Sequence, residues 1–168
     1  MTRSTRNSGH RGPKHSSESR AQLGLDVPPQ EQARPTRGRT AVNGLTLDAG
    51  ALVAIDHGGQ DMRALLRRAG AHGWPIVIPT GALAQAWRGG ARQARLAAFL
   101  GTRRDGPVLH LLDAAVARAA GELCGRTGVA DVIDASVVLR ARSHGHHVVT
   151  SDPRDLAGLD GTLPIVIV

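Results

Sequence analysis

From Leu45 to the end of the chain, short apolar runs alternate with segments of helical periodicity. Runs such as WPIVIPT and LPIVIV are short and rich in β-branched residues, which predicts buried strands. DMRALLRRAGAH places its apolar side chains on one helical face, which predicts an amphipathic helix. The pattern predicts strands at 45–48, 74–80, 107–112, 146–152 and 163–168. It predicts helices at 61–72, 81–88, 91–103, 113–128, 131–145 and 152–159.

This alternation predicts the α/β class. We expect a parallel sheet of four or five strands with helices on both faces, an α/β/α sandwich, over residues 45–168. Ligands of such sheets bind beyond the carboxyl ends of the strands. Asp48 and Asp152 come at the ends of two predicted strands, and Asp113 follows a third. The carboxyl edge of the sheet is therefore where functional residues are expected.

Residues 1–44 differ from the rest of the chain. They are rich in Ser, Thr, Arg, Pro and Gly and have no periodic apolar pattern, so we expect them to be disordered. Three interpretations stay open for this segment: a basic arm that contacts nucleic acid, a linker, and an over-long translated start.

The net charge of +7 is unevenly distributed. Residues 1–40 hold eight Arg or Lys and three Asp or Glu, a balance of +5; the remainder holds thirteen and eleven, a balance of +2. The folded part is nearly neutral, so its pI is no evidence for nucleic-acid binding. A single cysteine excludes an internal disulfide. No apolar run is long enough to cross a bilayer and no secretory signal is evident, so a cytoplasmic protein is expected.

Several aspartates have an ordinary structural interpretation. Asp48, Asp131 and Asp152 each precede a predicted or possible helix, where Asp is a preferred N-cap. Asp113 is interpreted as a cap as well. Asp155 is interpreted as a first-turn acid that complements the helix dipole.

Asp134 does not fit that interpretation. In ADVIDASVVLRA it lies one turn inside the helix among apolar residues, on the same face as Asp131. A buried carboxylate must be neutralised or partnered, and no arginine lies at helical spacing on its N-terminal side. A divalent cation lets several carboxylates gather. The sequence therefore predicts Mg²⁺ or Mn²⁺ held by Asp48, Asp131, Asp134 and Asp152.

Other site chemistries find little support. His144, His146 and His147 are interpreted as surface turn residues, because no acid or cysteine lies beside them at zinc-site spacing. The sequence has no phosphate-binding G-x-x-x-x-G-K-[ST] loop and no G-x-S-x-G elbow. One phenylalanine and two tryptophans make a stacking platform for bases improbable.

Three segments in order, TLDAGALVA, ADVIDASVVLRA and VVTSDPRDLAGL, resemble the PIN domain family, and are most similar to its VapC-like ribonuclease toxins. The resemblance covers about residues 45–168. It implies a metal-dependent endoribonuclease that acts on structured RNA such as tRNA or rRNA. It also implies a cognate antitoxin and a homodimer.

The resemblance implies roles for single residues. Asp48 and Asp134 would be direct metal ligands, Asp152 a ligand or a water-orienting group, and Asp131 an auxiliary ligand. Gln85 stands where the family usually has a glutamate, and it supplies no charge. Two hypotheses follow: Asp131 restores the missing charge, or the domain is catalytically weak or silent and binds RNA or a protein.

Further residues are candidates for RNA contact. The hydroxyl of Thr150 or Ser151 is placed to hydrogen-bond the scissile phosphate or a metal-bound water. Arg88, Arg92 and Arg95 have helical spacing, which Gly89-Gly90 would interrupt. They are interpreted either as phosphate contacts or as a solvated or antitoxin-binding helix face.

Overall fold

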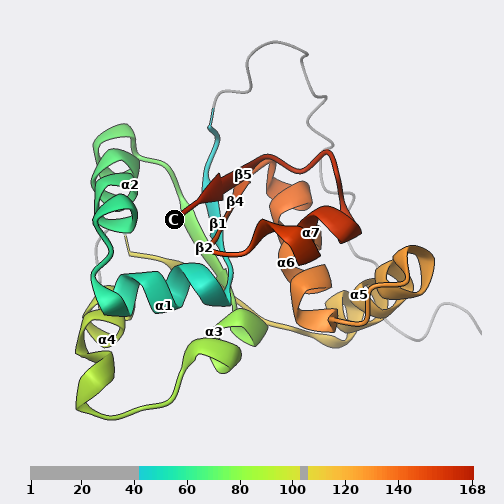
Figure 1. Ribbon diagram of the computed structural model, residues 1–168, viewed down its shortest axis with the longest axis horizontal. Helices are drawn as coiled ribbons and strands as arrows, with labels where there is room; N and C mark the ends of the chain where they lie inside the picture. The colour runs from blue at the N-terminus through green and yellow to red at the C-terminus, as the bar shows by residue number, and fades with distance from the viewer. Residues whose placement is uncertain (1–41, 103–105) are drawn as a thin grey trace, which may run out of the picture. The chain divides into compact units, whose positions relative to one another are not determined.

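The computed structural model describes residues 42–102 and 106–168. Its sheet has five parallel strands in the order β3-β2-β1-β4-β5 (Figure 1). The strands are β1 (Leu45–Leu47), β2 (Ile76–Pro79), β3 (Val108–His110), β4 (His147–Thr150) and β5 (Ile165–Ile167). The predicted α/β class and parallel sheet are confirmed. The disorder expected for 1–44 falls almost wholly outside the described residues.

Seven α-helices and one 3₁₀ helix accompany these strands within the described residues. They are α1 (Ala49–His57), α2 (Gln60–His72), α3 (Thr80–Ala86), η1 (Ala91–Gln93), α4 (Ala94–Leu100), α5 (Ala114–Thr127), α6 (Val132–His144) and α7 (Pro153–Leu159). In Figure 1, α1, α2 and α4 cover one face of the sheet, and α5, α6 and α7 cover the other. This is the expected α/β/α sandwich.

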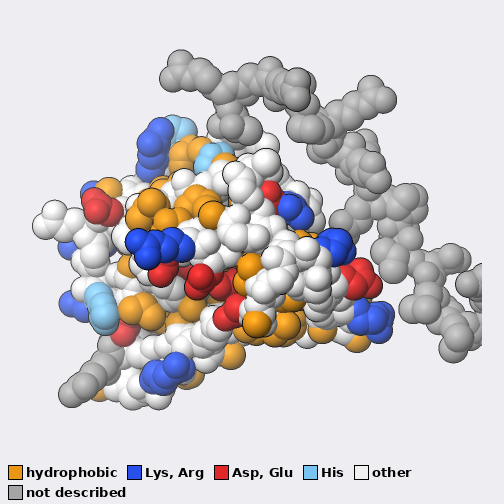
Figure 2. Space-filling model, turned by 45° about the vertical axis from the view of Figure 1, so that its right-hand side comes forward, with side chains coloured by type: hydrophobic (Ala, Val, Ile, Leu, Met, Phe, Trp, Pro, Cys, Tyr) orange, Lys and Arg blue, Asp and Glu red, His pale blue; other side chains and the backbone are white. Residues whose placement is uncertain are grey.

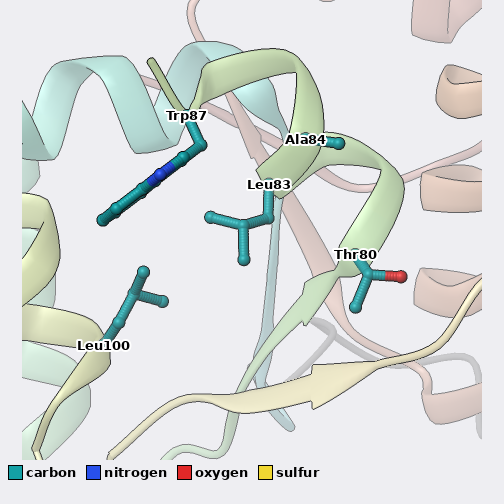
Figure 3. A pocket seen from close by; sticks show the side chains of 5 residues that line it. All are labelled: Thr80, Leu83, Ala84, Trp87 and Leu100. Atoms are coloured by element: carbon teal, nitrogen blue, oxygen red, sulfur yellow. The ribbon is translucent and has the colours of Figure 1, made fainter. Parts of the chain in front are cut away.

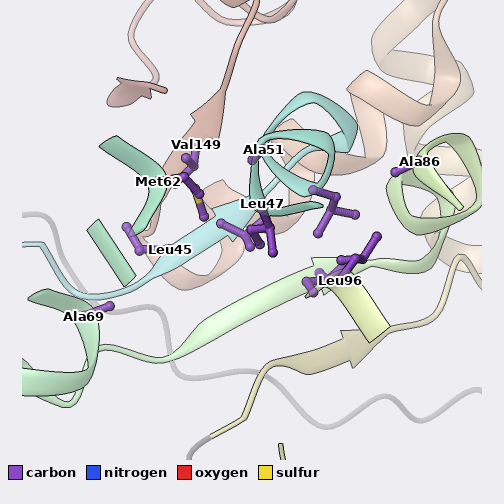
Figure 4. Close-up of a cluster of buried hydrophobic side chains, with 11 residues drawn as sticks. Leu45, Leu47, Ala51, Met62, Ala69, Ala86, Leu96 and Val149 are labelled. Atoms are coloured by element: carbon purple, nitrogen blue, oxygen red, sulfur yellow. The ribbon is translucent and has the colours of Figure 1, made fainter. Parts of the chain in front are cut away.

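Two buried clusters hold the layers together. On the α1–α2–α4 face, Leu45 and Leu47 of β1 pack with Leu52, Met62 and Leu96 (Figure 4). On the other face, Val137, Val138 and Ala141 of α6 pack with Val148 of β4 and Leu156 of α7. Successive strand residues serve opposite faces, since Val148 belongs to one cluster and Val149 to the other.

The central strand fixes the carboxyl edge. β1 pairs with β2 on one side and with β4 on the other, and Leu47 lies in register with Val149. The residues that follow β1 and β4 therefore leave the sheet side by side. The main-chain N–H of Asp48 donates to the carbonyl of Val149 at 3.1 Å, which extends this pairing to the acid itself.

Glycine conformations explain one departure from the predicted elements. A single helix was expected over 91–103, after a first helix that ends at Gly89-Gly90. α3 ends at Ala86, because Trp87 is already extended; Gly89 and Gly90, with φ of 74° and 84°, then keep the chain out of helix until η1. At the end of α6, Gly145 has φ of 64° and caps the helix as predicted.

The prediction that His146 is a surface turn residue is wrong. Its side chain is 4% exposed, and its Nδ1 lies 3.2 Å from the Thr46 hydroxyl. Gly44 makes room for the ring, because a Cβ there would lie 2.4 Å from the ring's Nε2. Burial, as the largest cause, and the neighbouring His144 and His147 together lower the pKa of His146 to about 4.

No helix of the described residues is both long and apolar enough to cross a membrane.

The burial of His146 predicts acid-sensitive stability. Its folded-state pKa lies below the ordinary 6.5, so its contribution is complete above pH 6.5 and is lost as pH falls towards 4. We expect the unfolding free energy to fall by roughly 2–3 kcal/mol more between pH 7.5 and 4.5 in the parent than in His146→Gln. Urea unfolding at both pH values measures this, and parallel pH profiles would contradict it.

Candidate functional site

Three aspartates at the carboxyl edge each begin a helix. Asp48 caps α1, Asp131 caps α6 and Asp152 caps α7. Their carboxylates accept main-chain N–H groups of the first turn at 2.7 to 3.2 Å. The cap interpretation is thus correct for all three, and also for Asp113 of α5.

Capping uses only one of the two oxygens of each of these carboxylates. In Asp48, Asp131 and Asp152 alike, the capping oxygen is Oδ1. The cap fixes each side chain at a helix N-terminus and does not use Oδ2. A cap and a cation ligand are therefore compatible roles for the same side chain.

Asp134 lies at the centre of the acidic group. It is half-buried in the first turn of α6 and caps nothing. Burial, as the largest cause, and the nearby negative charges together raise its pKa to about 6; the charges belong to Asp131, Asp48, Asp155 and Asp152. Figure 2 shows acidic side chains gathered near the middle of the face in view. Residues from three segments far apart in sequence are thus close enough to repel one another.

Asp48 is the most buried of these acids, with 8% of its surface exposed. Burial raises its pKa, and the charge of Asp152 adds to this. Hydrogen bonds from the Thr150 hydroxyl and from the main-chain N–H groups of Gly50 and Ala51 act in the opposite direction. The net effect is a raised pKa, so desolvation outweighs these hydrogen bonds.

Thr150 connects the two strand ends. Its hydroxyl accepts the Asp152 main-chain N–H at 2.9 Å and donates to the Asp152 carbonyl at 3.1 Å, and it lies near enough to Asp48 to lower the pKa of that carboxylate. Thr150 is completely buried, so it offers no surface to a phosphate. The structure therefore corrects the substrate contact predicted for it, and gives it the role of positioning Asp48 and Asp152. Ser151 is exposed, so a hydrogen bond from its hydroxyl to the substrate phosphate stays a prediction.

Gly50 brings the turn after β4 close to the start of α1. A Cβ at Gly50 would lie 2.2 Å from the Ser151 Oγ and 3.1 Å from the Ser151 main-chain nitrogen. Only glycine lets the two turns approach so closely. The absence of a side chain at Gly50 therefore lets the Asp48 and Asp152 turns lie close to each other.

Gln85 lies on α3 and is exposed. One turn earlier, Gly81 faces Ile133, since a Cβ there would lie 2.7 Å from the Ile133 Cδ1. Residues four apart share a helix face, so Gln85 lies on the face that meets the start of α6. It brings no charge to the acids there.

Asp155 is the acid that the sequence interpretation missed. It lies in the first turn of α7, as expected for a residue that complements the dipole, and its charge also raises the pKa of Asp134. A signal was present in the sequence. Asp152 and Asp155 repeat the three-residue spacing of Asp131 and Asp134.

The arginines do not form one helical face. Arg88 follows α3 and donates to the carbonyls of Ala84 and Trp87. Arg95 belongs to α4 and donates to the Asp56 carbonyl at 2.9 Å. Gly89-Gly90 thus interrupt the helical spacing of these arginines, as the sequence indicated, and the side chain of Arg92 lies outside what the structure describes.

A pocket between α3 and α4 is separate from the acids. It has a volume of about 350 Å³, and Figure 3 shows the residues that line it: Thr80, Leu83, Ala84, Trp87 and Leu100. The lining holds no acid. Trp87 is 42% exposed, which the sequence alone did not indicate.

The acids match a hard divalent cation in chemistry. Their oxygens are the ligands that Mg²⁺ and Mn²⁺ prefer, and their mutual repulsion is what such an ion relieves. Among the described residues, however, no group of three or more His, Cys, Asp or Glu side chains is arranged to hold an ion. The carboxylates are therefore of the right chemical type for the predicted ion, but the described residues do not form a complete set of ligands around one point.

Comparison with solved structures identifies the fold. VapBC2 of Rickettsia felis, bound to a DNA fragment from its promoter, matches with a TM-score of 0.57 and 18% identity, over 74% of this chain and 98% of that one. The chain has the fold of VapC-like PIN-domain toxins. VapC20 of Mycobacterium tuberculosis, described as a toxin that cleaves the sarcin–ricin loop, matches with a TM-score of 0.56 and 16% identity. This match covers 74% of this chain and 100% of that one. DNA-bound VapBC of Salmonella typhimurium matches with a TM-score of 0.55 and 20% identity, over 74% of this chain and 97% of that one. No family model and no curated protein matches the sequence.

Within this PIN fold, the repulsion at Asp134 predicts a measurable cost in stability. Its pKa is raised, so the ionised form is disfavoured in the folded state and stability is lost as pH rises from about 4 through 6. We expect Asp134→Asn to stabilise the protein at pH 7.5 by about 1–2 kcal/mol, after discounting for its partial exposure.

The matched control is Glu122→Gln on α5, an exposed acid outside the group. Its substitution should change stability by less than about 0.5 kcal/mol. Urea unfolding in EDTA at pH 7.5 and pH 4 compares the variants, and the gain at Asp134 should vanish at the lower pH. A loss of stability at pH 7.5 would show that the Asp134 carboxylate is favourably partnered.

Proposed function

We propose that this protein is a metal-dependent endoribonuclease that acts as a toxin and is restrained by a cognate antitoxin. The observation that carries the proposal is the position of Asp134. In a chain with a PIN fold, Asp134 lies near enough to Asp48, Asp131 and Asp152 for their charges to raise its pKa. Related folds include a toxin described as cleaving the sarcin–ricin loop and a toxin–antitoxin complex from Klebsiella pneumoniae.

The proposed roles are those that the resemblance implies, and the acidic chemistry of these side chains supports them. Asp48 and Asp134 would hold Mg²⁺ or Mn²⁺ directly, with Asp152 as a ligand or as the group that orients the attacking water. When bound, a divalent cation lowers the pKa of water and stabilises charge on the leaving oxygen. The buried Thr150 keeps Asp48 and Asp152 in position. The hydroxyl of the exposed Ser151 donates a hydrogen bond to the substrate phosphate.

Asp131 has a special place in the proposal because Gln85 is neutral. Asp131 contributes the largest of the neighbouring charges that act on Asp134. We propose that Asp131 supplies the negative charge that the family's usual glutamate would bring, and that Asp155 adds to it. An acid on α6 would thereby replace one on α3.

Gln85 also favours a second candidate function. Without that charge, and without a preformed ligand group among the described residues, the domain would bind metal weakly and act by binding RNA or a protein. The two candidates share a fold and a surface. They differ in whether metal promotes cleavage.

The proposed partners are structured RNA such as tRNA or rRNA, an antitoxin and a second copy of the chain. Exposed apolar side chains along and after β3 support a protein partner, since such patches mark interaction surfaces. They belong to Val108, Leu109, Leu111 and Leu112.

Cleavage of a structured RNA in the presence of Mn²⁺ tests the first candidate. We expect the parent to cleave, and EDTA or Asp134→Asn to lower the rate at least about 100-fold, because water activation is lost. Glu122→Gln should cleave like the parent. Cleavage that survives both chelation and Asp134→Asn would refute a metal-dependent mechanism, and intact RNA with the metal-loaded parent would favour the silent domain.

A double substitution tests the compensation by Asp131. We expect Asp131→Asn to weaken Mn²⁺ binding about tenfold or more while α6 stays capped, because Asn is an equally good N-cap. Adding Gln85→Glu to this variant should restore most of the affinity. Isothermal titration with Mn²⁺ measures both steps. If Gln85→Glu gives no recovery, the two positions do not serve the same ion.

A further inference from the structure

The pocket between α3 and α4 has the size of a small planar ligand. Its volume of about 350 Å³ is near the lower end of the range of about 300–1,000 Å³ that is typical of small-molecule sites. Figure 3 shows the side chains of Trp87, Leu83 and Leu100 around one open space. This space suits a single ring system better than a partner helix, which is about 10–12 Å across with its side chains.

The backbone that carries Trp87 is held by Gln93, whose side chain is only 8% exposed. Its Oε1 accepts the main-chain N–H groups of Arg88 and Gly89, both at 2.6 Å, and its Nε2 donates to the Ala86 carbonyl at 2.9 Å. Three hydrogen bonds of one buried side chain thus fix the turn that follows Trp87. An exposed indole on a fixed turn is preorganised for binding, because little conformational entropy is lost when a ligand arrives.

A cation lies beside this apolar pocket. The exposed Arg88 follows Trp87 directly, and its Nη1 donates to the carbonyls of Ala84 at 3.4 Å and Trp87 at 2.9 Å. A guanidinium has five N–H donors, so further donors remain for an anion such as a phosphate. An apolar pocket next to a cation matches the base and the phosphate of one nucleotide, whereas an apolar protein side chain would not need the cation.

Helix α3 places this pocket close to the acidic group. It begins directly after β2, at the carboxyl edge of the sheet. Gly81 lies on the side of α3 that meets α6, whereas Leu83 and Trp87 lie on the side that lines the pocket. The width of one helix, about 10–12 Å, therefore separates the two sides. A short stretch of single-stranded RNA spans this distance, so a strand whose phosphate lies at the acids reaches the pocket.

The pocket mainly offers an aromatic face and apolar contact. The Thr80 hydroxyl accepts the Leu112 main-chain N–H at 3.1 Å, and Figure 3 shows its oxygen turned away from Leu83 and Leu100. Stacking on an aromatic side chain is open to every base, since each base has a π-face. The bases that proteins stack in RNA are the unpaired ones of loops, bulges and ends.

We propose that the pocket between α3 and α4 binds one unpaired base of the RNA substrate by stacking on Trp87, while Arg88 contacts a phosphate of the same strand. The inference rests on the proposed function, because it takes RNA as the substrate. It adds a base-binding site that is separate from the acids. A single tryptophan serves a single base, so the scarcity of aromatic residues is no obstacle.

RNA binding in EDTA, where a metal-dependent cleavage cannot occur, tests the inference. One probe is a fluorescent RNA hairpin with a single-stranded loop, and the second is the same hairpin with abasic sites throughout the loop. We expect Trp87→Ala to weaken binding of the first hairpin about tenfold, because stacking on one aromatic side chain is lost. The abasic hairpin should bind the parent and Trp87→Ala equally, since its loop has no base to stack. Anisotropy titrations measure these affinities.

Conservative substitutions serve as controls. Trp87→Phe keeps an aromatic face and should retain most of the affinity. Trp74→Phe changes the other tryptophan, which precedes β2 at the opposite end from α3, and should bind like the parent. Arg88→Gln should make the slope of log K against log salt shallower by about 0.7, the value for one single-strand phosphate contact.

Equal affinity of the parent and Trp87→Ala for the first hairpin, or an equal loss with the abasic hairpin, would overturn the inference. Sedimentation velocity tests a different occupant. If Trp87→Ala changes the oligomeric state and leaves RNA affinity unchanged, the pocket is a contact between copies of the chain and the inference is overturned.

Mn²⁺-dependent cleavage by the same proteins keeps the two proposals separate. RNA binding that depends on Trp87 and on the loop bases, without any cleavage by the parent, would refute the nuclease function alone. Cleavage by the parent, with RNA affinity that does not depend on Trp87, would refute this inference alone.

Discussion

Mutual repulsion among carboxylates at one edge of the sheet is the constraint on which the account of this protein depends. Asp134 is half-buried, caps no helix and faces the charges of four other aspartates, so burial and repulsion raise its pKa to about 6. A purely structural role would not need this arrangement, because it costs stability at neutral pH. An acidic group that is kept at such a cost is the usual sign of a functional site.

The fold gathers the acids by simple means. Parallel pairing of β1 with β4 sends Asp48 and Asp152 out of the sheet side by side, and α6 enters the same edge with Asp131 and Asp134. Helix caps fix three of the carboxylates through one oxygen each. The buried Thr150 hydroxyl and the close approach at Gly50 then hold the two strand ends together.

Much of this was predictable from the sequence, and the exceptions have physical reasons. Strong periodicity in the short apolar runs located every strand and the sheet class, and Asp134 stood out because it lies among apolar residues beyond any cap. Burial of His146 was not predictable, because it depends on the space left by Gly44, a hundred residues away. The burial of Thr150 and the charge of Asp155 near Asp134 likewise arise from tertiary contacts that local patterns do not encode.

The central claim is that Asp134 is destabilised by its neighbours until a divalent cation joins them. Titration of the Asp134 carboxyl carbon by ¹³C NMR, in EDTA and again with saturating Mg²⁺, measures this directly. The account predicts a pKa near 6 in EDTA, and one below the ordinary 3.8 when Mg²⁺ is bound. A pKa near 3.8 in both conditions would show that the acids neither crowd one another nor share an ion, and would contradict the account.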